Sequence, residues 1–228
     1  MMARRVRGIP LDDYLSHLDR RALFAGRWGL RGSPEELAEQ GEPRLRELLA
    51  EVRMQGIAQA GVAYGFFAAH AEGDSVIVQH EGGEVRWSFP RQLRDERLCL
   101  ADFVRAEGDV IGLMVVSVGP AWGEVGAAWR EAGRFRDFFE LHGLGAALAE
   151  ALADHWHERM RKERGIDAGQ SYSFGFPACP DLSARGDLAR LVGADRIGVE
   201  ITDGHMLVPE HSVDALVLFH PAARLFSP

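Results

Sequence analysis

The segment from Asp109 to Val118 constrains the fold more than any other part of this sequence. Its side chains are almost all apolar, and valine is the commonest residue among them. Branching at Cβ favours extended backbone, and the run is short for a buried helix. The segment therefore predicts a central β-strand.

The neighbouring segments predict a sheet accompanied by separate helices. Further strands are expected over residues 61–69, over a hairpin of 75–80 and 84–89, and over 197–202 and 213–219. Helices are expected over 10–19, 43–55, 122–140, 144–164 and 184–192. One more begins at the capping box of Ser33 and is interrupted by Gly41 and Pro43. Because strands and helices segregate along the chain, the fold class is α+β.

Composition narrows the class of protein. A chain of 228 residues with 46% hydrophobic content can bury a core as one domain or as two small lobes. The net charge of −8 argues against nucleic acid and against an anionic membrane surface as partners. No stretch approaches the ~20 apolar residues of a membrane span, and no signal peptide is recognisable. A cytoplasmic protein is expected. Cys99 and Cys179 are too few for a disulfide scaffold.

Residues 171 to 181 fit neither a helical nor a strand pattern. They read Ser-Tyr-Ser-Phe-Gly-Phe-Pro-Ala-Cys-Pro-Asp. Pro177 and Pro180 fix their own φ and push the preceding residues towards extended backbone, whereas Gly175 is free to adopt φ > 0. We expect a stiff, extended apolar loop with exposed backbone groups, which suits a flat ligand. A buried structural connection is the alternative, and the residues alone favour it.

Residues with metal-binding or catalytic potential show no recognisable spacing. His155 and His157 stand close to Asp154 and Glu158, but the two histidines lie about 200° apart around a helix and cannot share a ligand site. A solvated helix face is the better interpretation. The other histidines considered, none at ligand spacing, are His205, His211 and His220. Since Cys179 also lacks a neighbouring base, the sequence predicts a binding loop without a metal site or catalytic residue.

The loop resembles the Arg-Tyr-Ser-Phe-Gly-Tyr-Pro-Ala-Cys-Pro-Asp motif of the activation domain of cobalamin-dependent methionine synthase. Further stretches resemble that domain in the same order: Trp28–Gly32, Tyr64–Phe67, Leu100–Val104, His157–Lys162, Ile197–Thr202 and His220–Pro221. The resemblance covers about Ile9 to Phe226, so residues 1–228 are identified as one such domain.

This resemblance implies a C-shaped single domain with a twisted, mainly antiparallel sheet and flanking helices. In the family, the domain binds S-adenosylmethionine and sits over a cobalamin-binding module. Reduction of cob(II)alamin by flavodoxin or a similar donor is coupled there to methyl transfer, and the chemistry belongs to the cobalt. The implied partners are therefore the cobalamin module and a flavodoxin-like reductase. This chain alone has no complete methyltransferase site.

The resemblance also implies which residues contact S-adenosylmethionine. The Ser173 backbone faces the adenine, Asp19 lies near an acidic contact for the ligand's amino group, and Glu150 matches an acidic residue of the site. A solvated carboxylate is an equal alternative for Glu150. The implied contacts are Asp19, Glu150, Ser171, Ser173, Gly175, Phe176, Pro177, Leu225 and Phe226.

Three positions depart from the family pattern. Ser171 replaces an arginine, while Phe176 and Leu225 replace tyrosines. A lost charged hydrogen bond costs about 1.5–3 kcal/mol and each lost hydroxyl about 0.5–1.5 kcal/mol, so weak ligand binding is expected. Two alternatives therefore stand beside the activation domain. One is a docking module that has lost the ligand, and the other is a reactivation partner of another corrinoid methyltransferase.

Overall fold

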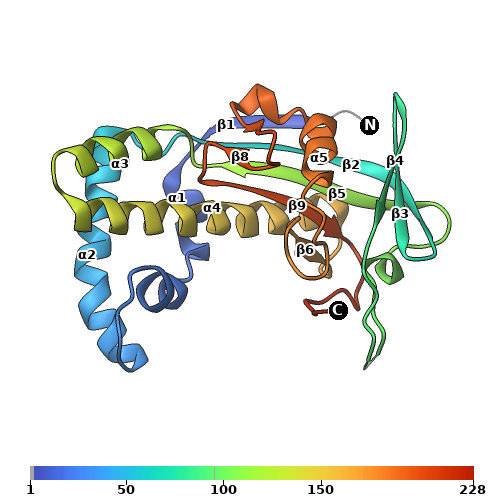
Figure 1. Ribbon diagram of the computed structural model, residues 1–228, viewed down its shortest axis with the longest axis horizontal. Helices are drawn as coiled ribbons and strands as arrows, with labels where there is room; N and C mark the ends of the chain where they lie inside the picture. Colours follow the sequence, from blue (N-terminus) through green and yellow to red (C-terminus); the bar gives the residue numbers. More distant parts are fainter. Residues whose placement is uncertain (1–2, 95) are drawn as a thin grey trace.

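The computed structural model describes residues 3–94 and 96–228, and a seven-stranded sheet forms its centre (Figure 1). The strands follow the order β4-β3-β2-β5-β9-β6, with β1 paired to β2, and these pairings are antiparallel. The bounds are β1 Arg4–Ile9, β2 Ala60–Glu72, β3 Ser75–His80, β4 Gly83–Ser88, β5 Asp109–Ser117, β6 Gln170–Tyr172 and β9 Ser212–Leu218. The inner position of β5, between β2 and β9, confirms the predicted central strand.

Some strands escape the sequence patterns. β1 carries Arg4, Arg5 and Arg7 and is largely exposed, so it shows no apolar alternation. β6 has only three residues. The strand predicted over 197–202 shrinks to β7 Glu200–Ile201, which pairs with β8 Leu207–Val208 in a separate ribbon.

The helices are α1 Leu11–Tyr14, α2 Pro34–Gln55, α3 Ala121–Glu131, α4 Phe135–Arg164 and α5 Ala184–Val192. Short 3₁₀ turns occupy η1 Leu15–His17, η3 Leu100–Phe103 and η4 Ala194–Ile197, and η2 Ala22–Arg27 is a π-helical turn. The helix expected over 10–19 is therefore shorter than predicted. The capping box at Ser33 is confirmed, because its hydroxyl accepts the Glu36 N–H at 3.3 Å while a Glu36 carboxylate oxygen accepts the Ser33 N–H at 2.7 Å.

The predicted interruption at Gly41 and Pro43 is wrong, because α2 runs through both residues. Gly41 is buried under Phe24, and a Cβ atom at position 41 would lie 2.6 Å from that ring. The glycine therefore permits close packing and does not end the helix. The helix ends as predicted at Gly56, whose φ of +64° is left-handed.

The helix predicted over 122–140 is in fact two helices. α3 ends at Glu131, and the chain turns at Gly133 with φ +75° before α4 begins at Phe135. α4 then continues for 30 residues to the predicted stop at Gly165. At ~1.5 Å per residue the helix is about 45 Å long and spans most of the molecule.

Both faces of the sheet are covered, and two apolar clusters result. Alternation along β5 places Met114 and Val116 in the cluster beneath α2 and α4. Leu113 and Val115 belong to the other cluster, which includes α5, η3 and the loop after β6.

Among the described residues, no helix combines the length and the hydropathy that crossing a bilayer demands.

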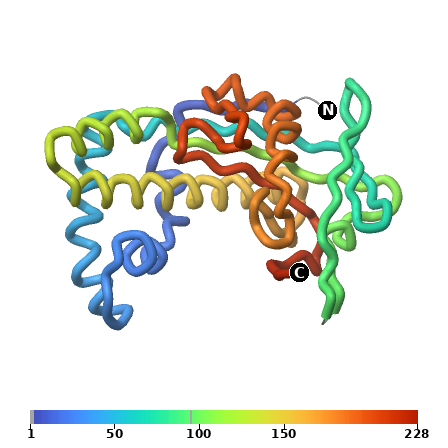
Figure 2. The backbone as a smooth tube through the Cα atoms, viewed as in Figure 1, coloured from blue at the N-terminus to red at the C-terminus, as the bar shows by residue number. Residues whose placement is uncertain are grey.

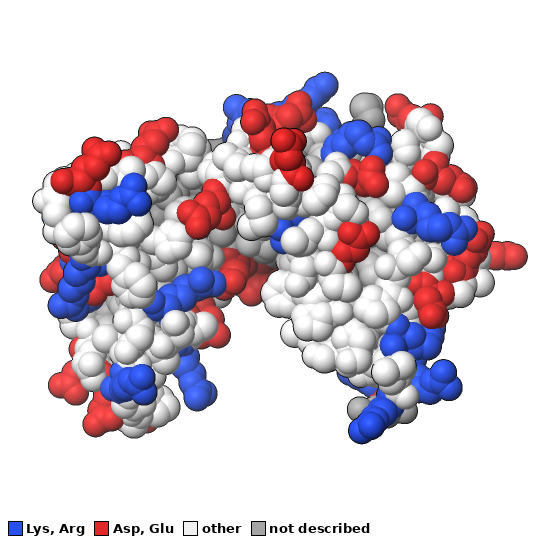
Figure 3. All heavy atoms as spheres, in the orientation of Figure 1, with Lys and Arg blue, Asp and Glu red and all other residues white. Residues whose placement is uncertain are grey.

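The molecule has the shape of an arch, which confirms the predicted C shape. α2 and the η2 turn form one leg, while the β3–β4 hairpin and the loop after β6 lie towards the other (Figure 1). Figure 2 shows the C-terminal tail on this second side, and Figure 3 shows an open notch between the legs. α4 and the sheet join the legs.

The buried face of α4 gives a direct test of the core assignment. Leu148 is fully buried, so Leu148→Asp should lower the free energy of unfolding by roughly 4 kcal/mol, as an unpaired buried charge does. Leu93 is 91% exposed, so Leu93→Asp is the matched control and should stay within about 0.5 kcal/mol of wild type. Urea denaturation measures both, and an unchanged Leu148→Asp midpoint would contradict the packing described.

Candidate functional site

A groove of about 480 Å³ lies where α4 meets the loop after β6 and the C-terminal tail. These three segments border the notch of the arch (Figure 1). The lining residues are Glu150, Ala153 and Asp154 of α4, residues 170–173 and 176–178 of β6 and its loop, Val213 and Ala215 of β9, and residues 225–227 of the tail. The groove thus combines an acidic helix face with apolar and backbone surfaces.

Two carboxylates on successive turns of α4 give one wall a negative charge. Glu150 Oε1 accepts a hydrogen bond from Arg27 Nη2 at 2.7 Å. Asp154 lines the groove and its side chain is exposed. Partial desolvation raises the pKa of Asp154; His17 opposes this shift, and Glu150 adds to it to a smaller extent. The described lining contains no lysine or arginine, so the wall suits a cationic ligand group.

The loop after β6 is folded back on itself, so the predicted extended shape with exposed backbone is wrong beyond Tyr172. The Gly175 N–H donates to the Cys179 carbonyl at 2.8 Å, and the Cys179 N–H donates to the Phe176 carbonyl at 2.9 Å. Gly175 has φ +99°, a left-handed conformation that glycine adopts without strain. The local turn outweighs the preference of the two prolines for extended neighbours. Phe176 consequently stands out at the tip with 59% of its surface exposed.

A buried ion pair holds this loop against the sheet. Arg185 Nε of α5 donates to Asp214 Oδ1 of β9 at 2.9 Å, and both side chains are largely buried. The second Asp214 oxygen accepts the Phe174 N–H at 3.0 Å, while Arg185 Nη2 donates to the Phe174 carbonyl at 2.6 Å. Both backbone groups of Phe174 are therefore fixed by one ion pair, and the Phe174 ring is buried against Trp87.

The C-terminal tail closes the far side of the groove. The Tyr172 hydroxyl donates to the Arg224 carbonyl at 2.9 Å, and the Phe226 ring contacts that of Phe103 at a centroid distance of 6.2 Å. Between these anchors the side chain of Leu225 is 71% exposed. The tail is thus positioned by β6 and η3, with Leu225 free at the rim.

The structure gathers most of the predicted contact residues in this groove: Glu150, Ser171, Ser173, Phe176, Pro177, Leu225 and Phe226. Gly175 lies behind the lining, where its Cα faces Leu182. Asp19 does not line the groove; its carboxylate instead accepts the Ala22 N–H at 2.8 Å, at the start of η2. Their roles towards a ligand stay predictions.

Asp154 is the lining residue that sequence reasoning placed elsewhere. The sequence predicts only a solvated helix face for it, together with His155 and His157, and Asp154 is indeed exposed. The only available signal was its position one turn after Glu150 on the same helix face. The two histidines have different neighbours, as predicted. The centroid of the His155 ring lies 5.3 Å from that of His17. His157 instead lies near Arg161, and desolvation together with Arg161 lowers the pKa of His157 to about 4.

The described residues of the groove contain no activated nucleophile. Cys179 is buried, and its thiol donates to the Ser173 carbonyl at 2.8 Å. Burial raises the pKa of Cys179 to about 12, with a smaller contribution from Asp214, so the reactive thiolate is suppressed. This cysteine stabilises the loop and supplies no chemistry.

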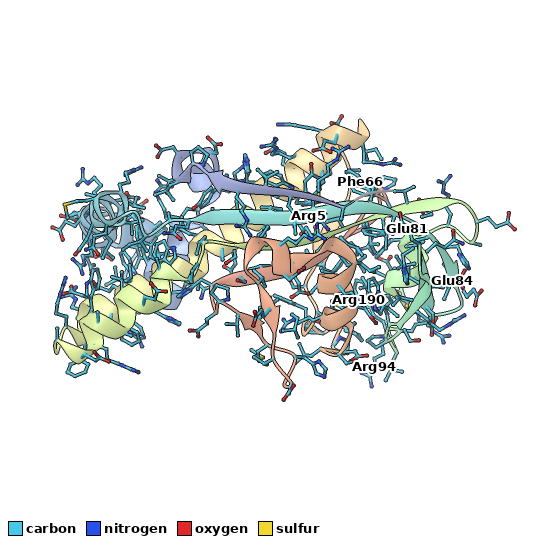
Figure 4. The ribbon with its side chains drawn as sticks, turned by 90° about the horizontal axis from the view of Figure 1, so that it is seen from above. Arg5, Phe66, Glu81, Glu84, Arg94 and Arg190 are labelled. Atoms are coloured by element: carbon cyan, nitrogen blue, oxygen red, sulfur yellow. The ribbon has the colours of Figure 1, made fainter. Side chains whose placement is uncertain are left out.

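A second hollow, of about 500 Å³, lies away from the groove. It is bordered by Arg5 of β1, Phe66 of β2, Glu81 of the β3–β4 turn and Arg190 of α5 (Figure 4). Charges of both signs meet there, and Arg190 already pairs with Asp187 at 2.9 Å. None of the predicted contact residues belongs to this hollow.

The described chain is thus an α+β arch with a groove lined by an acidic helix face, apolar side chains and backbone. Comparison with known proteins gives the family. The family model described as "Vitamin B12 dependent methionine synthase, activation domain" matches residues 33–227. The methionine synthases of Mycobacterium tuberculosis and Mycobacterium leprae are 38% and 37% identical to this chain over 99% of its length. The chain belongs to the methionine synthase activation-domain family.

Two further findings qualify the match. The chain spans 22% of the length of either mycobacterial methionine synthase, so it corresponds to one part of those proteins. A solved structure described as the MetH reactivation domain bound to AdoHcy has the same fold, with a TM-score of 0.88 and 20% identity. That match covers 100% of this chain and 81% of the other.

The Arg185–Asp214 pair provides a test of how the loop is held. Arg185→Ala leaves the Asp214 carboxylate buried without its partner, so it should destabilise the fold by roughly 3–5 kcal/mol. The control is Arg190→Ala on the same helix, which removes an exposed pair and should cost at most about 1 kcal/mol. Urea denaturation of the two variants decides, since equal losses would mean that the buried pair does not anchor the loop.

Proposed function

We propose that this chain binds S-adenosylmethionine in the groove between α4 and the loop after β6, and thereby supports reductive methylation of cobalamin in a methionine synthase. One observation carries the proposal. The family-motif loop, Glu150 and the tail, which are separate in the sequence, border a single groove. Family membership and the fold shared with a domain described as bound to AdoHcy support it.

The chemistry of the groove fits the two ends of this ligand differently. S-adenosylmethionine has a sulfonium cation and an ammonium group, and both would be attracted by Asp154 and Glu150 on α4. The adenosyl group would pack on the apolar rim of Phe176, Pro177 and Leu225. Attraction of the charged groups and burial of the flat base both favour binding.

The ligand's carboxylate lacks a comparable partner. Ser171 stands at the position of the family arginine, and the two arginines considered as replacements in space, Arg164 and Arg224, are engaged elsewhere. Arg164 Cζ lies 6.0 Å from the ring centroids of both Phe66 and Phe219, and the Arg224 guanidinium pairs with Glu96. Neither lines the groove. Binding should therefore be weak, and the adenosyl and cationic groups should provide most of its affinity.

The partner that fits this role is a cobalamin-binding module. The homologous proteins are much longer than this chain, so they have room for other modules. The notch of the arch offers a concave surface (Figure 3), and Phe176 and Leu225 of the adjoining groove are exposed. We propose transient docking of the cobalamin face in this notch, a flavodoxin-like electron donor and a cytoplasmic location.

Calorimetric titration with S-adenosylmethionine tests the proposed ligand. Wild type should bind detectably but weakly, and Ser171→Arg should bind about ten- to a hundred-fold more tightly, because a guanidinium pairs bidentately with a carboxylate. Gln79→Arg on β3 is the matched control, since it adds the same charge on the distant hairpin and should leave affinity unchanged. Tight wild-type binding would show that another group replaces the family arginine.

A second arm of the titration examines the acidic wall. Asp154→Asn should weaken binding of S-adenosylmethionine more than binding of S-adenosylhomocysteine, which lacks the sulfonium charge. Equal losses for the two ligands would remove the electrostatic role of Asp154. Absence of binding to wild type and to Ser171→Arg at millimolar ligand would favour the docking module that has lost its ligand.

Docking is tested with the cobalamin module loaded as cob(II)alamin. Addition of the chain should change the corrin absorption spectrum and give co-elution on gel filtration. Phe176→Asp should weaken both signals because it charges the apolar rim, whereas Met54→Asp, at the exposed end of α2, should not. An unaltered spectrum without co-elution would eliminate the activation role while leaving the ligand titration interpretable.

A further inference from the structure

A group of potential metal ligands lies on α4 away from the groove. His142 of α4 meets Glu210 and His211, which immediately precede β9. His142 precedes Glu150 by eight positions, which corresponds to about 12 Å along the helix axis. None of the three residues lines the groove proposed for S-adenosylmethionine.

The three side chains converge on one point. One potential ligand atom from each residue lies within 4.8 Å of the other two. His142 Nδ1 and Glu210 Oε2 are 3.9 Å apart, and the two imidazole rings are 5.0 Å apart between centroids at an interplanar angle of 61°. All three border a hollow of about 290 Å³ between α3 and α4, so an ion can enter from solvent.

The second observation is a buried ring nitrogen without a partner. His211 is only 4% exposed, and its Nε2 atom makes no hydrogen bond within the described structure. A buried polar atom in this state is costly unless a water or an ion satisfies it.

The backbone of α4 makes room for this ring. A Cβ atom at Gly145 would lie 3.0 Å from His211 Cδ2 and 2.9 Å from Trp122 Cε3. Glycine at this position therefore lets the imidazole lie against the helix one turn from His142. The Trp122 indole, whose N–H donates to the Val118 carbonyl at 3.2 Å, packs nearby at 6.1 Å from the His211 ring. The His211 side chain is thus held in position by packing even without a bound ion.

We propose that His142, Glu210 and His211 form a binding site for a divalent transition-metal ion, with zinc as the best match. Two imidazoles and a carboxylate are a ligand set that Zn²⁺ prefers, and Co²⁺ shares it. Ligand atoms around tetrahedral zinc are roughly 3.4 Å apart, so the outer ligands must approach by about 1 Å. His142 and Glu210 are half-exposed and exposed, which permits this movement. Solvent completes the coordination.

The bound ion would connect two parts of the fold. It joins the N-terminal half of α4 to the turn between β8 and β9, which are distant in the sequence. An ion that binds only the folded chain also raises its melting temperature, and the rise grows with the logarithm of the free ion concentration once this exceeds the Kd. This proposal does not depend on S-adenosylmethionine binding, since the two sites share no side chain.

The test uses the full 228-residue chain without a histidine tag. Titration with Co²⁺ should produce the visible d–d bands of a coordinated ion, and Zn²⁺ should bind calorimetrically at one ion per chain and raise the melting temperature. His142→Ala and Glu210→Gln should each weaken binding about ten-fold or more and reduce the thermal shift. Both residues are accessible, so these variants avoid disturbing the buried His211.

The control is His70→Ala, which removes a histidine from a two-residue pair with Glu72, whose facing atoms are 3.4 Å apart. This variant should bind Co²⁺ and Zn²⁺ as wild type does. The proposal is overturned if wild type gives neither d–d bands nor binding heat. It is equally overturned if His142→Ala and Glu210→Gln bind as tightly as wild type.

Discussion

The ion pair between Arg185 and Asp214 is the interaction on which the rest of the site depends. A charged pair inside a protein is favourable only when its remaining hydrogen-bonding groups are also satisfied. Here the backbone N–H and carbonyl of Phe174 meet that need, and the His205 carbonyl accepts a third Arg185 hydrogen bond at 3.2 Å. Satisfying two buried charges thus fixes α5, β9 and the loop of the groove relative to one another.

The groove is acidic because the arginines around it are already engaged in ion pairs. The arginines of the neighbourhood are already paired: Arg185 with Asp214, Arg27 with Glu150 and Arg224 with Glu96. The lining is therefore acidic on the helix side and apolar on the loop side. A cationic ligand with a flat apolar group matches this pattern, and an anionic group finds no countercharge there.

Structural features that depend on nearby residues could be predicted from the sequence. Features that depend on contacts between distant parts of the chain could not. β5, the β3–β4 hairpin, α5 and the Ser33 cap follow from patterns within a few residues. The continuity of α2 depends on Phe24 packing over Gly41, and the closed loop depends on Cys179, so neither is visible in a local pattern. Seven of the nine residues that the resemblance implies as ligand contacts line the groove. The approach of His142 to His211 needs the whole fold, because no spacing relates positions so far apart.

The outer strands of the sheet determine whether it can pair with another chain. An unpaired strand edge is a template for pairing with another chain. β1 presents exposed Arg4, Arg5 and Arg7, and β4 alternates exposed Glu84 and Arg86 with its buried side chains. β6 ends after three residues, and the tail crosses beside it. Charge and short length therefore keep the seven-stranded sheet from extending into another polypeptide, including a second copy of the chain.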